Sequence, residues 1–376
     1  MRLRLVTPRR FTVASWSSAV ERRSCFWTVD WMELSIVNPI EESSWDDWVL
    51  KQPGATIFHS SSWAQVLNET YGYQPLYAVL ESSSQRAAAL PLMEVSSGFT
   101  GTRGVSLPFA DFCPPLSTDD VERTLVERCL DYGRKRGWNY FEWRGGSFSD
   151  AHPVPWTTYL VHRLRLEAPE EKLWGRLRAS NRRNIRRARA REVEIAHLGD
   201  DRSVEDYYVL HCKTRRKHGL PPQPIRLFTN IQKYIFDRGR GFVTLARCEG
   251  RVVAGAIFFH FGDEAVYKFG ASDLAFSRRR PNNLVLWDAI RHCRNLQLAC
   301  VSFGRTNPKN AGLLQFKRGW GAEEQNVSYF RAAVDGRSLG IHRGHSALGV
   351  FTKKIVQRIP LAILRVAGEL SYRHMG

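Results

Sequence analysis

The order of the predicted elements in the first half of the chain recurs in the second half, and this repeat constrains the fold more than any single motif. In each half, helices are followed by a β-hairpin, by another helix and then by a strand that carries an aromatic residue and an arginine. These two strands are Tyr140–Arg144 and Val301–Arg305. The architecture recurs although the residues differ. The pattern predicts an α/β fold with mixed sheets, made of two similar domains side by side.

The length of 376 residues fits two domains, since a domain usually has ~100–200 residues. We predict a first domain over 32–166 and a second domain over 167–335. Residues 1–31 are rich in Arg and Ser and show no regular period. We expect either a loosely ordered extension there or a true start at Met32. Residues 336–376 are predicted to form a separate basic, amphipathic tail.

The charge of the chain is strongly positive but local. There are 55 Lys and Arg residues against 37 Asp and Glu residues, which gives a net charge of +18. Three segments hold the whole surplus: residues 1–31 carry +4, residues 175–191 carry +8 and residues 336–376 carry +6. The remaining residues are neutral. This distribution argues against a general nucleic-acid-binding surface and indicates local anion sites instead.

Several classes of protein are excluded by what the sequence lacks. No apolar run approaches the ~18–20 residues of a membrane-spanning helix. The seven cysteines are scattered and show no CxxC spacing, which argues against a zinc site or a disulfide framework and favours a reducing, cytoplasmic compartment. The chain has no P-loop, no dinucleotide-binding fingerprint, no nucleophile motif and no histidine pair at metal spacing. We therefore predict no metal.

Several local predictions bear on the site. Pro169–Glu192 is predicted as one helix, since proline suits the first turn and Glu170 and Glu171 lie near the positive end of the helix dipole. Ala87–Val95 is predicted as one strand. A helix is predicted after Pro281, whereas residues 312–321 are predicted to form a loop.

The run of arginines in residues 175–191 is the strongest local anomaly. On a helix the arginines would form two adjacent faces, namely Arg182, Arg186 and Arg189 on one and Arg183, Arg187 and Arg191 on the other. Like charges this dense repel one another. Two explanations stay open: partial pairing with the acid-rich first domain, or binding of a phosphate-bearing ligand such as tRNA, a nucleotide-sugar or a lipid pyrophosphate.

Two explanations also stay open for the tail. Its apolar residues alternate with Lys353, Lys354, Arg358 and Arg365. This pattern is typical of a C-terminal helix that packs on the protein and leaves its basic face in solvent. It is also typical of a basic amphipathic segment that lies on an anionic membrane surface.

Two short motifs combine cations with glycine. His218 precedes Gly219, a combination that is typical of a helix C-terminus. Phe316–Gly321 places Lys317 and Arg318 between aromatic residues and glycines. Gly319 and Gly321 permit a close approach of the backbone to a ligand; the simpler alternative is a turn anchored by its aromatic residues.

Seven segments together resemble the Fem-type (FemAB-like) aminoacyl and peptidyl transferases, which belong to the GNAT acyltransferase superfamily. The resemblance covers about residues 36–333, and the segments follow one another in the family's order. They are Phe58–Trp63, Tyr71–Pro75, Leu90–Met93, Ser106–Phe109, Asn181–Ala188, Lys217–Pro221 and Phe316–Gly321.

This resemblance implies two tandem GNAT-like acyl-CoA N-acyltransferase domains with the acceptor bound near their junction. Members move an acyl or aminoacyl group onto an amine, so the acceptor here would be a cell-envelope or exopolysaccharide precursor. The lysine of the family's Phe-Lys-x-Gly-aromatic-Gly motif matches Lys317. It would stabilise the oxyanion that forms when an amine attacks an ester or thioester, an interaction that contributes ~3–4 kcal/mol.

The resemblance also implies phosphate-binding residues. GNAT enzymes hold the pyrophosphate of their donor at a helix N-terminus, and the turn over residues 278–283 occupies that place here, with arginines and no glycine. The predicted phosphate-binding residues are Arg182, Arg183, Arg186, Arg187, Arg279, Arg280, Asn283 and Arg318. The donor is left open between acyl-CoA and aminoacyl-tRNA. Asp288, His218 and Glu142 are the candidates for a general base.

A second function stays open beside acyl transfer. The chain could be a non-catalytic GNAT-fold protein that binds a phosphate-bearing ligand, either RNA or an anionic lipid, with a steep dependence on salt. In both cases we expect a cytoplasmic protein. Its partners would be a phosphate-bearing small molecule or lipid-linked precursor, with tRNA and peripheral contact with the inner membrane face as further expectations.

Overall fold

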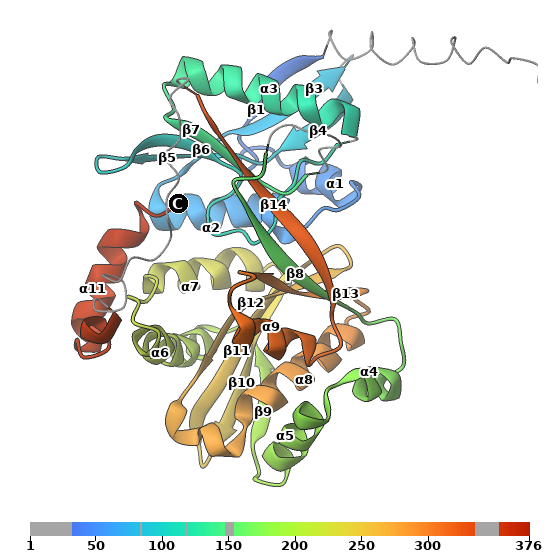
Figure 1. Cartoon of the computed structure of the whole chain (residues 1–376), viewed down its shortest axis with the longest axis vertical. Helices are drawn as coiled ribbons and strands as arrows, with labels where there is room; N and C mark the ends of the chain where they lie inside the picture. The colour runs from blue at the N-terminus through green and yellow to red at the C-terminus, as the bar shows by residue number, and fades with distance from the viewer. Residues whose placement is uncertain (1–31, 83–84, 118, 147–153, 335–352) are drawn as a thin grey trace, which may run out of the picture.

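The computed structural model describes residues 32–82, 85–117, 119–146, 154–334 and 353–376. The predicted extension over residues 1–31 lies outside this part. The first half of the chain contains eight strands and several helices (Figure 1). In chain order they are β1 (Glu33–Val37), α1 (Trp45–Leu50), η1 (Ile57–His59), α2 (Ser61–Tyr71), β2 (Gln74–Pro75), β3 (Tyr77–Ser82), β4 (Gln85–Leu90), β5 (Met93–Ser97), β6 (Gly101–Val105), α3 (Asp119–Arg136), β7 (Tyr140–Arg144) and β8 (Thr157–Arg165).

The second half begins with helices and ends on a long strand. Its elements are α4 (Glu170–Arg176), α5 (Ala179–Arg189), β9 (Glu194–Leu198), α6 (Asp201–Lys217), α7 (Ile225–Ile231), the π-helix η2 (Gln232–Phe236), β10 (Gly241–Cys248), β11 (Arg251–Phe261), β12 (Glu264–Ser272), η3 (Leu274–Arg279), α8 (Pro281–Asn295), β13 (Cys300–Thr306), α9 (Ala311–Arg318) and β14 (Glu323–Ala333). Helix α11 (Leu361–Tyr372) follows in the tail.

The strands form one sheet of eleven and one of three. The order in the large sheet is β2-β5-β6-β7-β14-β8-β13-β12-β11-β10-β9, and the small sheet is β1-β3-β4. The predicted α/β fold with mixed sheets is confirmed. The two halves exchange strands in the middle of the large sheet, because β8 of the first half pairs with β13, and β14 of the second half pairs with β7. The large sheet therefore runs across the predicted domain boundary at residues 166 and 167. The division into two domains stays a prediction.

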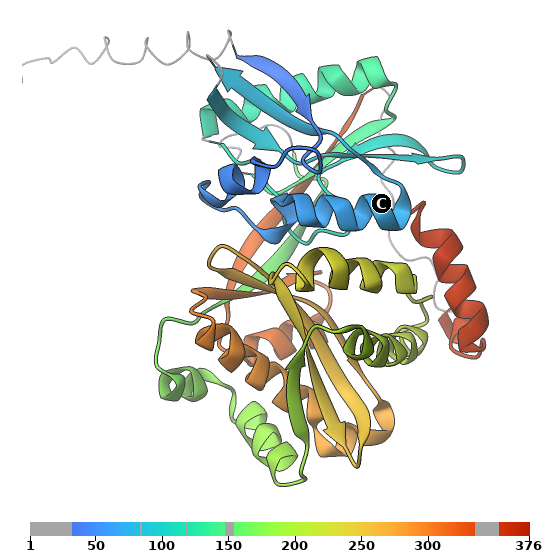
Figure 2. The same ribbon diagram turned by 180° about the vertical axis from the view of Figure 1, so that it is seen from behind.

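Helices cover both faces of the second half of the sheet. Helices α6 and α7 lie on one face, next to α2 of the first half, and α8, α5 and α4 lie on the other (Figure 2). One hydrophobic core joins α2, α6 and α7 with the sheet, and it includes Trp63, whose ring lies 5.6 Å from that of Phe259. A second core lies under α8 and contains Trp287 and Trp320. The two halves of the chain therefore share a hydrophobic core on the side of the sheet that α6 covers.

Strands β12 and β13 separate soon after they begin to pair. Their parallel pairing joins Glu264 to Cys300, Ala265 to Val301 and Val266 to Ser302. Beyond these positions β12 continues to Ser272 and β13 to Thr306 without further pairing between them. Two neighbouring parallel strands that diverge leave unpaired main-chain groups and room for side chains or a ligand between them.

Three local predictions are wrong, and the first two fail for a tertiary or a steric reason. The helix predicted over Pro169–Glu192 is two helices, because Leu177 and Arg178 adopt extended backbone angles. The main-chain N–H of Arg178 donates a 2.9 Å hydrogen bond to Gly319 O. The strand predicted over Ala87–Val95 is interrupted at Pro91, so that β4 and β5 belong to different sheets.

The third difference concerns residues 312–321, which were predicted to form a loop. Residues Ala311–Arg318 form helix α9, which is capped by the side chain of Asn310 through a 3.2 Å hydrogen bond to Leu313 N. The buried ring of Trp320 anchors the chain after the helix ends. A helix of eight residues gives too short a periodic pattern to be recognised from sequence alone.

Candidate functional site

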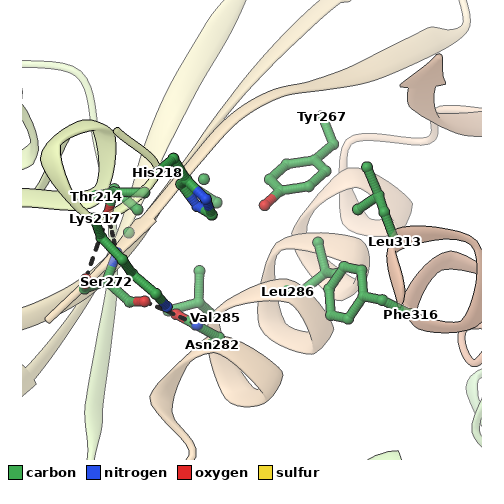
Figure 3. A pocket seen from close by; sticks show the side chains of 14 residues that line it. Thr214, Lys217, His218, Tyr267, Ser272, Asn282, Val285, Leu286, Leu313 and Phe316 are labelled. Atoms are coloured by element: carbon green, nitrogen blue, oxygen red, sulfur yellow. Dashed lines mark hydrogen bonds between the residues drawn. The ribbon is translucent and has the colours of Figure 1, made fainter. Parts of the chain in front are cut away.

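A cavity of about 290 Å³ lies against the part of β12 that follows its separation from β13. Its walls come from five elements, β11, β12, α6, α8 and α9 (Figure 3). The side chains with polar groups lie mainly at one end and include Thr214, Lys217, His218, Ser272 and Asn282. The opposite end is apolar and is formed by Leu286, Leu313 and Phe316, and the hydroxyl of Tyr267 points into the space between the two ends. A pocket with one polar and one apolar end suits a ligand of the same character.

The polar end is held together by hydrogen bonds between α6, β12 and α8. Asn282 Nδ2 donates to Ser272 Oγ at 3.1 Å, and Ser272 N donates to Thr214 Oγ1 at 3.0 Å. Helix α8 begins here with Pro281 after Arg280, whose backbone is left-handed at φ 58°. The N-terminus of a fifteen-residue helix carries partial positive charge and favours a phosphate. The chemistry of this end therefore fits a phosphate group.

His218 is the one general-base candidate that lines the cavity. Burial lowers its pKa, and the neighbouring cations of Lys217 and Arg215 lower it further. The imidazole is therefore neutral at neutral pH and can accept a proton. His218 is also the C-cap of α6, so the prediction of a normal helix end is compatible with its place in the cavity.

The other two candidates lie elsewhere. Asp288 on α8 contacts His197 Nε2 at 3.1 Å and does not line the cavity. Glu142 is buried between Arg144 and Arg331. Burial would raise the pKa of Glu142, but the two guanidinium groups outweigh it and hold the pKa below its ordinary value. Neither group is placed to take a proton from a ligand in this cavity.

Lys317 is buried on α9. It follows Phe316 of the cavity wall in the sequence, but it does not itself line the cavity. Its Nζ atom donates hydrogen bonds to Gly304 O at 2.8 Å and to Arg305 O at 3.2 Å, on β13 just beyond its separation from β12. Burial lowers its pKa to about 8. An ammonium group has three N–H donors, and the hydrogen bonds within the described part of the chain use two of them.

A charged cluster that the sequence did not reveal lies beside Lys317, and we call it the junction cluster: Asp111, Lys268 and Arg305. Lys268 Nζ of β12 donates to Asp111 Oδ2 at 2.8 Å, and Arg305 Nε of β13 lies 4.0 Å from Asp111 Oδ1. Burial would raise the pKa of Asp111, but Lys268 and Arg305 outweigh it and lower the pKa. The cluster therefore attaches the first half of the chain to both diverging strands.

One sequence signal could have revealed this cluster. Lys268 is the only charged residue of the segment Ala265–Phe269, which is otherwise apolar or aromatic. A cation in such a strand needs a buried partner. The sequence does not identify Asp111 as this partner, because the two residues meet only through the fold.

The arginines of α5 have different roles. Arg182 Nη1 donates to Gly175 O at 2.9 Å and to Leu177 O at 2.7 Å, so it caps the end of α4. Arg186 lies over the ring of Trp174, with its guanidinium carbon 5.8 Å from the ring centroid. Arg183 and Arg187 are exposed, and neither forms an ion pair within the described residues. These two are the predicted phosphate-binding residues of α5 that remain available to a ligand.

The predicted residues near α8 and α9 are mostly engaged with the protein. Arg279 forms an ion pair with Glu249. Arg318 forms a bidentate pair with Glu324 at 2.7 and 2.9 Å. Asn283 Nδ2 donates to Asn181 Oδ1 at 3.3 Å, which joins α8 to α5. Arg280 is exposed at the start of α8. The arginine helix α5 thus lies alongside α8, the helix that forms one wall of the cavity.

Gly319 and Gly321 approach the protein itself. A Cβ atom on Gly321 would lie 2.9 Å from the Cβ atom of Arg176, and one on Gly319 would lie 3.0 Å from Asn181 Nδ2. Asn181 Nδ2 donates to Gly319 O at 2.9 Å. The two glycines therefore lie in the turn that follows α9 and pack against α4 and α5.

The described residues contain no group of three or more His, Cys, Asp or Glu side chains that could hold a metal ion. In the same part of the chain, no helix has both the length and the apolar character needed to cross a membrane.

Comparison with known proteins agrees with this geometry. Residues 175–318 match the family described as Acetyltransferase (GNAT) domain. The fold is similar to the crystal structure of FemX, with a TM-score of 0.63 at 13% identity over 80% of this chain and 97% of that chain. No curated protein matches the chain in sequence.

Two further solved structures share the fold. One is a tandem GNAT protein from the clavulanic acid biosynthesis pathway, with a TM-score of 0.51 at 13% identity over 82% of this chain and 100% of that chain. The other is L-PGS from Bacillus licheniformis, with a TM-score of 0.51 at 12% identity over 85% of this chain and 98% of that chain. The predicted tandem GNAT-like fold is confirmed. Residues 175–318 therefore match a GNAT acetyltransferase domain, within a chain that has the fold of a tandem GNAT protein.

Proposed function

We propose that the protein transfers an acyl or aminoacyl group to an amine of a phosphate-bearing cell-envelope or exopolysaccharide precursor. The observation that carries the proposal is the cavity between β12, α8 and α9, which has a polar end at the start of α8 and an apolar end formed by α9. Acyl-CoA combines a pyrophosphate with an acyl thioester, so it suits such a cavity better than a uniformly polar donor does. We therefore place acyl-CoA first and aminoacyl-tRNA second as donor.

The proposed reaction has three events. An amine nitrogen of the acceptor attacks the carbonyl carbon of the donor, the carbonyl oxygen gains negative charge, and the bond to the leaving sulfur or oxygen then breaks. His218, neutral and at the cavity wall, is the candidate to accept the proton that the amine loses. The leaving thiolate or alkoxide takes up a proton in turn, so that no covalent enzyme intermediate is required.

Lys317 is the candidate for stabilising the developing negative charge. Two main-chain carbonyl groups hold its ammonium at fixed geometry, and one N–H remains for the carbonyl oxygen of a donor. A hydrogen-bond donor that is held in place in a water-poor site stabilises an oxyanion more than a mobile surface lysine would. Burial around Lys317 supplies that environment.

The exposed side chains of Arg183, Arg187 and Arg280 are the candidates for binding acceptor or donor phosphates. Guanidinium groups suit phosphate because they donate two parallel hydrogen bonds. Arg182, Arg186, Arg279 and Arg318 have partners within the protein. We propose that these four have mainly structural roles.

We place the reaction in the cytoplasm. The six cysteines in the described part of the chain are all free, and five of them are buried. Free thiols are the usual state of cysteine in a reducing compartment.

The test is a transfer assay with the full chain. Acyl-CoAs and charged tRNAs are offered separately to amino-sugar nucleotides and lipid-linked amino sugars, and products are identified by mass spectrometry. We expect an amide product with one donor class, and loss of product in Lys317→Ala and His218→Gln. Lys233→Ala is the matched control, because Lys233 is exposed on η2. Absence of both transfer and CoA binding would overturn the proposal.

A further inference from the structure

Helix α11 has two apolar faces, and the described part of the chain covers only one of them. Leu364, Gly368 and Tyr372 are buried against the protein. On the other side, Ile363, Val366 and Leu370 are 58%, 59% and 62% exposed. Their spacing of three and four residues places them on one stripe of the helix. Single exposed apolar residues are ordinary, whereas a continuous stripe indicates a surface that has a partner.

The stripe continues onto the hairpin between β5 and β6. Phe99 at the hairpin tip is 87% exposed, and its ring lies 5.2 Å from that of His374. Phe99, Leu370 and Met375 line one shallow groove of about 590 Å³. The hairpin and α11 lie on the same side of the molecule in both views (Figures 1 and 2). We call this surface the α11 face: Phe99, Ile363, Val366, Leu370 and Met375.

The α11 face is preformed, because both halves of the chain hold the segment in place. Arg103 of β6 donates to Gly376 O at 2.7 and 3.0 Å and to His374 O at 2.9 Å. Tyr73 Oη donates to Tyr372 O at 3.0 Å, and Arg215 of α6 contacts the hydroxyl of Tyr372. A helix whose C-terminal end is held by both halves of the chain presents its outer stripe with little cost for ordering it on binding.

The segment that carries this apolar surface is basic, and one of its cations, Arg373, lines the groove. Residues 353–376 contain five basic side chains, which are all exposed, and one acidic residue, Glu369. None of the five is paired with a carboxylate within the described residues. They are Lys353, Lys354, Arg358, Arg365 and Arg373. An exposed apolar stripe in a segment of net positive charge complements a surface of hydrocarbon and negative charge.

We propose that the α11 face is a docking surface for an anionic lipid membrane, with α11 lying parallel to the membrane plane. Ile363, Val366 and Leu370 would enter the boundary between headgroups and acyl chains, with Phe99 and Met375 beside them. The cations would contact the lipid phosphates. A second copy of the chain is the less suitable partner, because a two-fold contact would bring the same basic residues against each other.

The segment that precedes α11 adjoins the cavity of the proposed active site. Gln357 Nε2 donates to the main-chain oxygen of Lys217 at 2.6 Å, and Lys217 and His218 line the cavity. Docking would therefore hold the cavity near the membrane surface. The proposal does not rest on the transfer reaction, because lipid binding is measured without donor or acceptor.

The experiment is vesicle flotation with the full chain, using vesicles of phosphatidylcholine alone and of phosphatidylcholine with phosphatidylglycerol. We expect the protein to float with the anionic vesicles at least tenfold more than with the neutral ones, and binding to weaken as salt increases. Val366→Glu and Leu370→Glu should each reduce binding to anionic vesicles at least tenfold. Leu296→Glu is the matched control, because Leu296 is also exposed, at 43%, but lies at the end of α8.

A second variant tests the charges separately from the apolar stripe. Lys353→Gln combined with Lys354→Gln should weaken binding to anionic vesicles and flatten its salt dependence, while the thermal unfolding temperature stays unchanged. Two outcomes overturn the proposal. One is undiminished binding by Leu370→Glu. The other is that the free wild-type protein is a dimer by analytical ultracentrifugation and Leu370→Glu is a monomer, which would assign the α11 face to a second copy.

Discussion

Lys317 Nζ donates a 2.8 Å hydrogen bond to the carbonyl oxygen of Gly304, and this contact attaches α9 to β13 where β13 leaves β12. Gly304 has a left-handed backbone with φ 65°, and a Cβ atom there would lie 3.1 Å from the carboxyl carbon of Asp111. Glycine is therefore needed at this position. The lysine, the glycine and the carboxylate meet at the one place in the sheet where β12 and β13 diverge.

The first prediction concerns Lys317→Ala. If Lys317 stabilises the oxyanion, kcat should fall about 10²–10³-fold, the usual effect of removing one such donor. The protein should remain folded, because water can occupy the space that the lysine side chain leaves and donate hydrogen bonds to the two carbonyl groups. Single-turnover kinetics and circular dichroism measure the two effects. Turnover at the wild-type rate would remove Lys317 from the mechanism.

The second prediction concerns pH. Burial lowers the pKa of Lys317 to about 8, so its ammonium form predominates below that pH and is lost above it. Oxyanion stabilisation by the cation predicts that kcat falls as the pH rises through about 8. In Lys317→Arg this decline should disappear, because a guanidinium group stays protonated. A rate that instead rises through the same range would indicate that neutral Lys317 acts as a base.

Much of the fold could be predicted from periodic segments. The helix after Pro281, the hairpin of β10 and β11 and the strands of the sheet follow from local patterns of apolar residues. The break between α4 and α5 could not be predicted, because Arg178 leaves the helical conformation to bond Gly319, far away in the sequence. Local propensity cannot report such a contact.

The candidate site could be predicted only in part. The motif around Lys317 and the segment with His218 mark two of its residues. Which arginines remain free could not be predicted, since Arg279 meets Glu249 and Arg318 meets Glu324 only in the fold. The pairing of Asp111 with Lys268 is similarly invisible in the sequence, because the two residues lie in different halves of the chain.

The third prediction concerns the junction cluster. Asp111→Ala would leave the buried ammonium of Lys268 without its carboxylate, and the free energy of unfolding should fall by about 3–5 kcal/mol. Combining Asp111→Ala with Lys268→Met should restore part of the loss, because no buried charge is then unpaired. Urea unfolding of the wild type, both single variants and the double variant gives the coupling free energy between Asp111 and Lys268. If the two substitutions changed the free energy of unfolding additively, the pairing would be contradicted.

The same pair predicts a loss of stability in acid. The pKa of Asp111 is lower in the folded protein than its ordinary value, so the unfolded chain takes up a proton there at higher pH than the folded protein does. The contribution of Asp111 to stability is therefore present above a pH of about 4 and is lost as the pH falls through the folded pKa. Urea midpoints should decline with acid more steeply in the wild type than in the double variant.

The fourth prediction concerns the free arginines of α5. Arg183→Gln combined with Arg187→Gln should raise KM for the phosphate-bearing substrate about tenfold or more, because a hydrogen bond to a charged group contributes about 1.5–3 kcal/mol. kcat should change much less, since these side chains lie away from Lys317. Arg226→Gln is the matched control, because Arg226 is an exposed arginine on α7. Equal KM values for the double variant and the control would show that the α5 arginines bind no substrate phosphate.

The last prediction separates structural from ligand-binding roles of the two glycines after α9. Gly321 has φ 75°, and a Cβ atom there would lie 2.9 Å from that of Arg176, which belongs to α4. Gly321→Ala should therefore reduce the free energy of unfolding by about 1–3 kcal/mol, from backbone strain alone, with a further loss from the contact. Gly312→Ala is the matched control, because Gly312 lies in α9 with only Asn310 Oδ1 within 4 Å, at 3.9 Å. Alanine stabilises a helix relative to glycine, so Gly312→Ala should unfold at the same or a higher temperature. If Gly321→Ala keeps its stability but loses substrate affinity, Gly321 faces a ligand and the turn is part of the binding site.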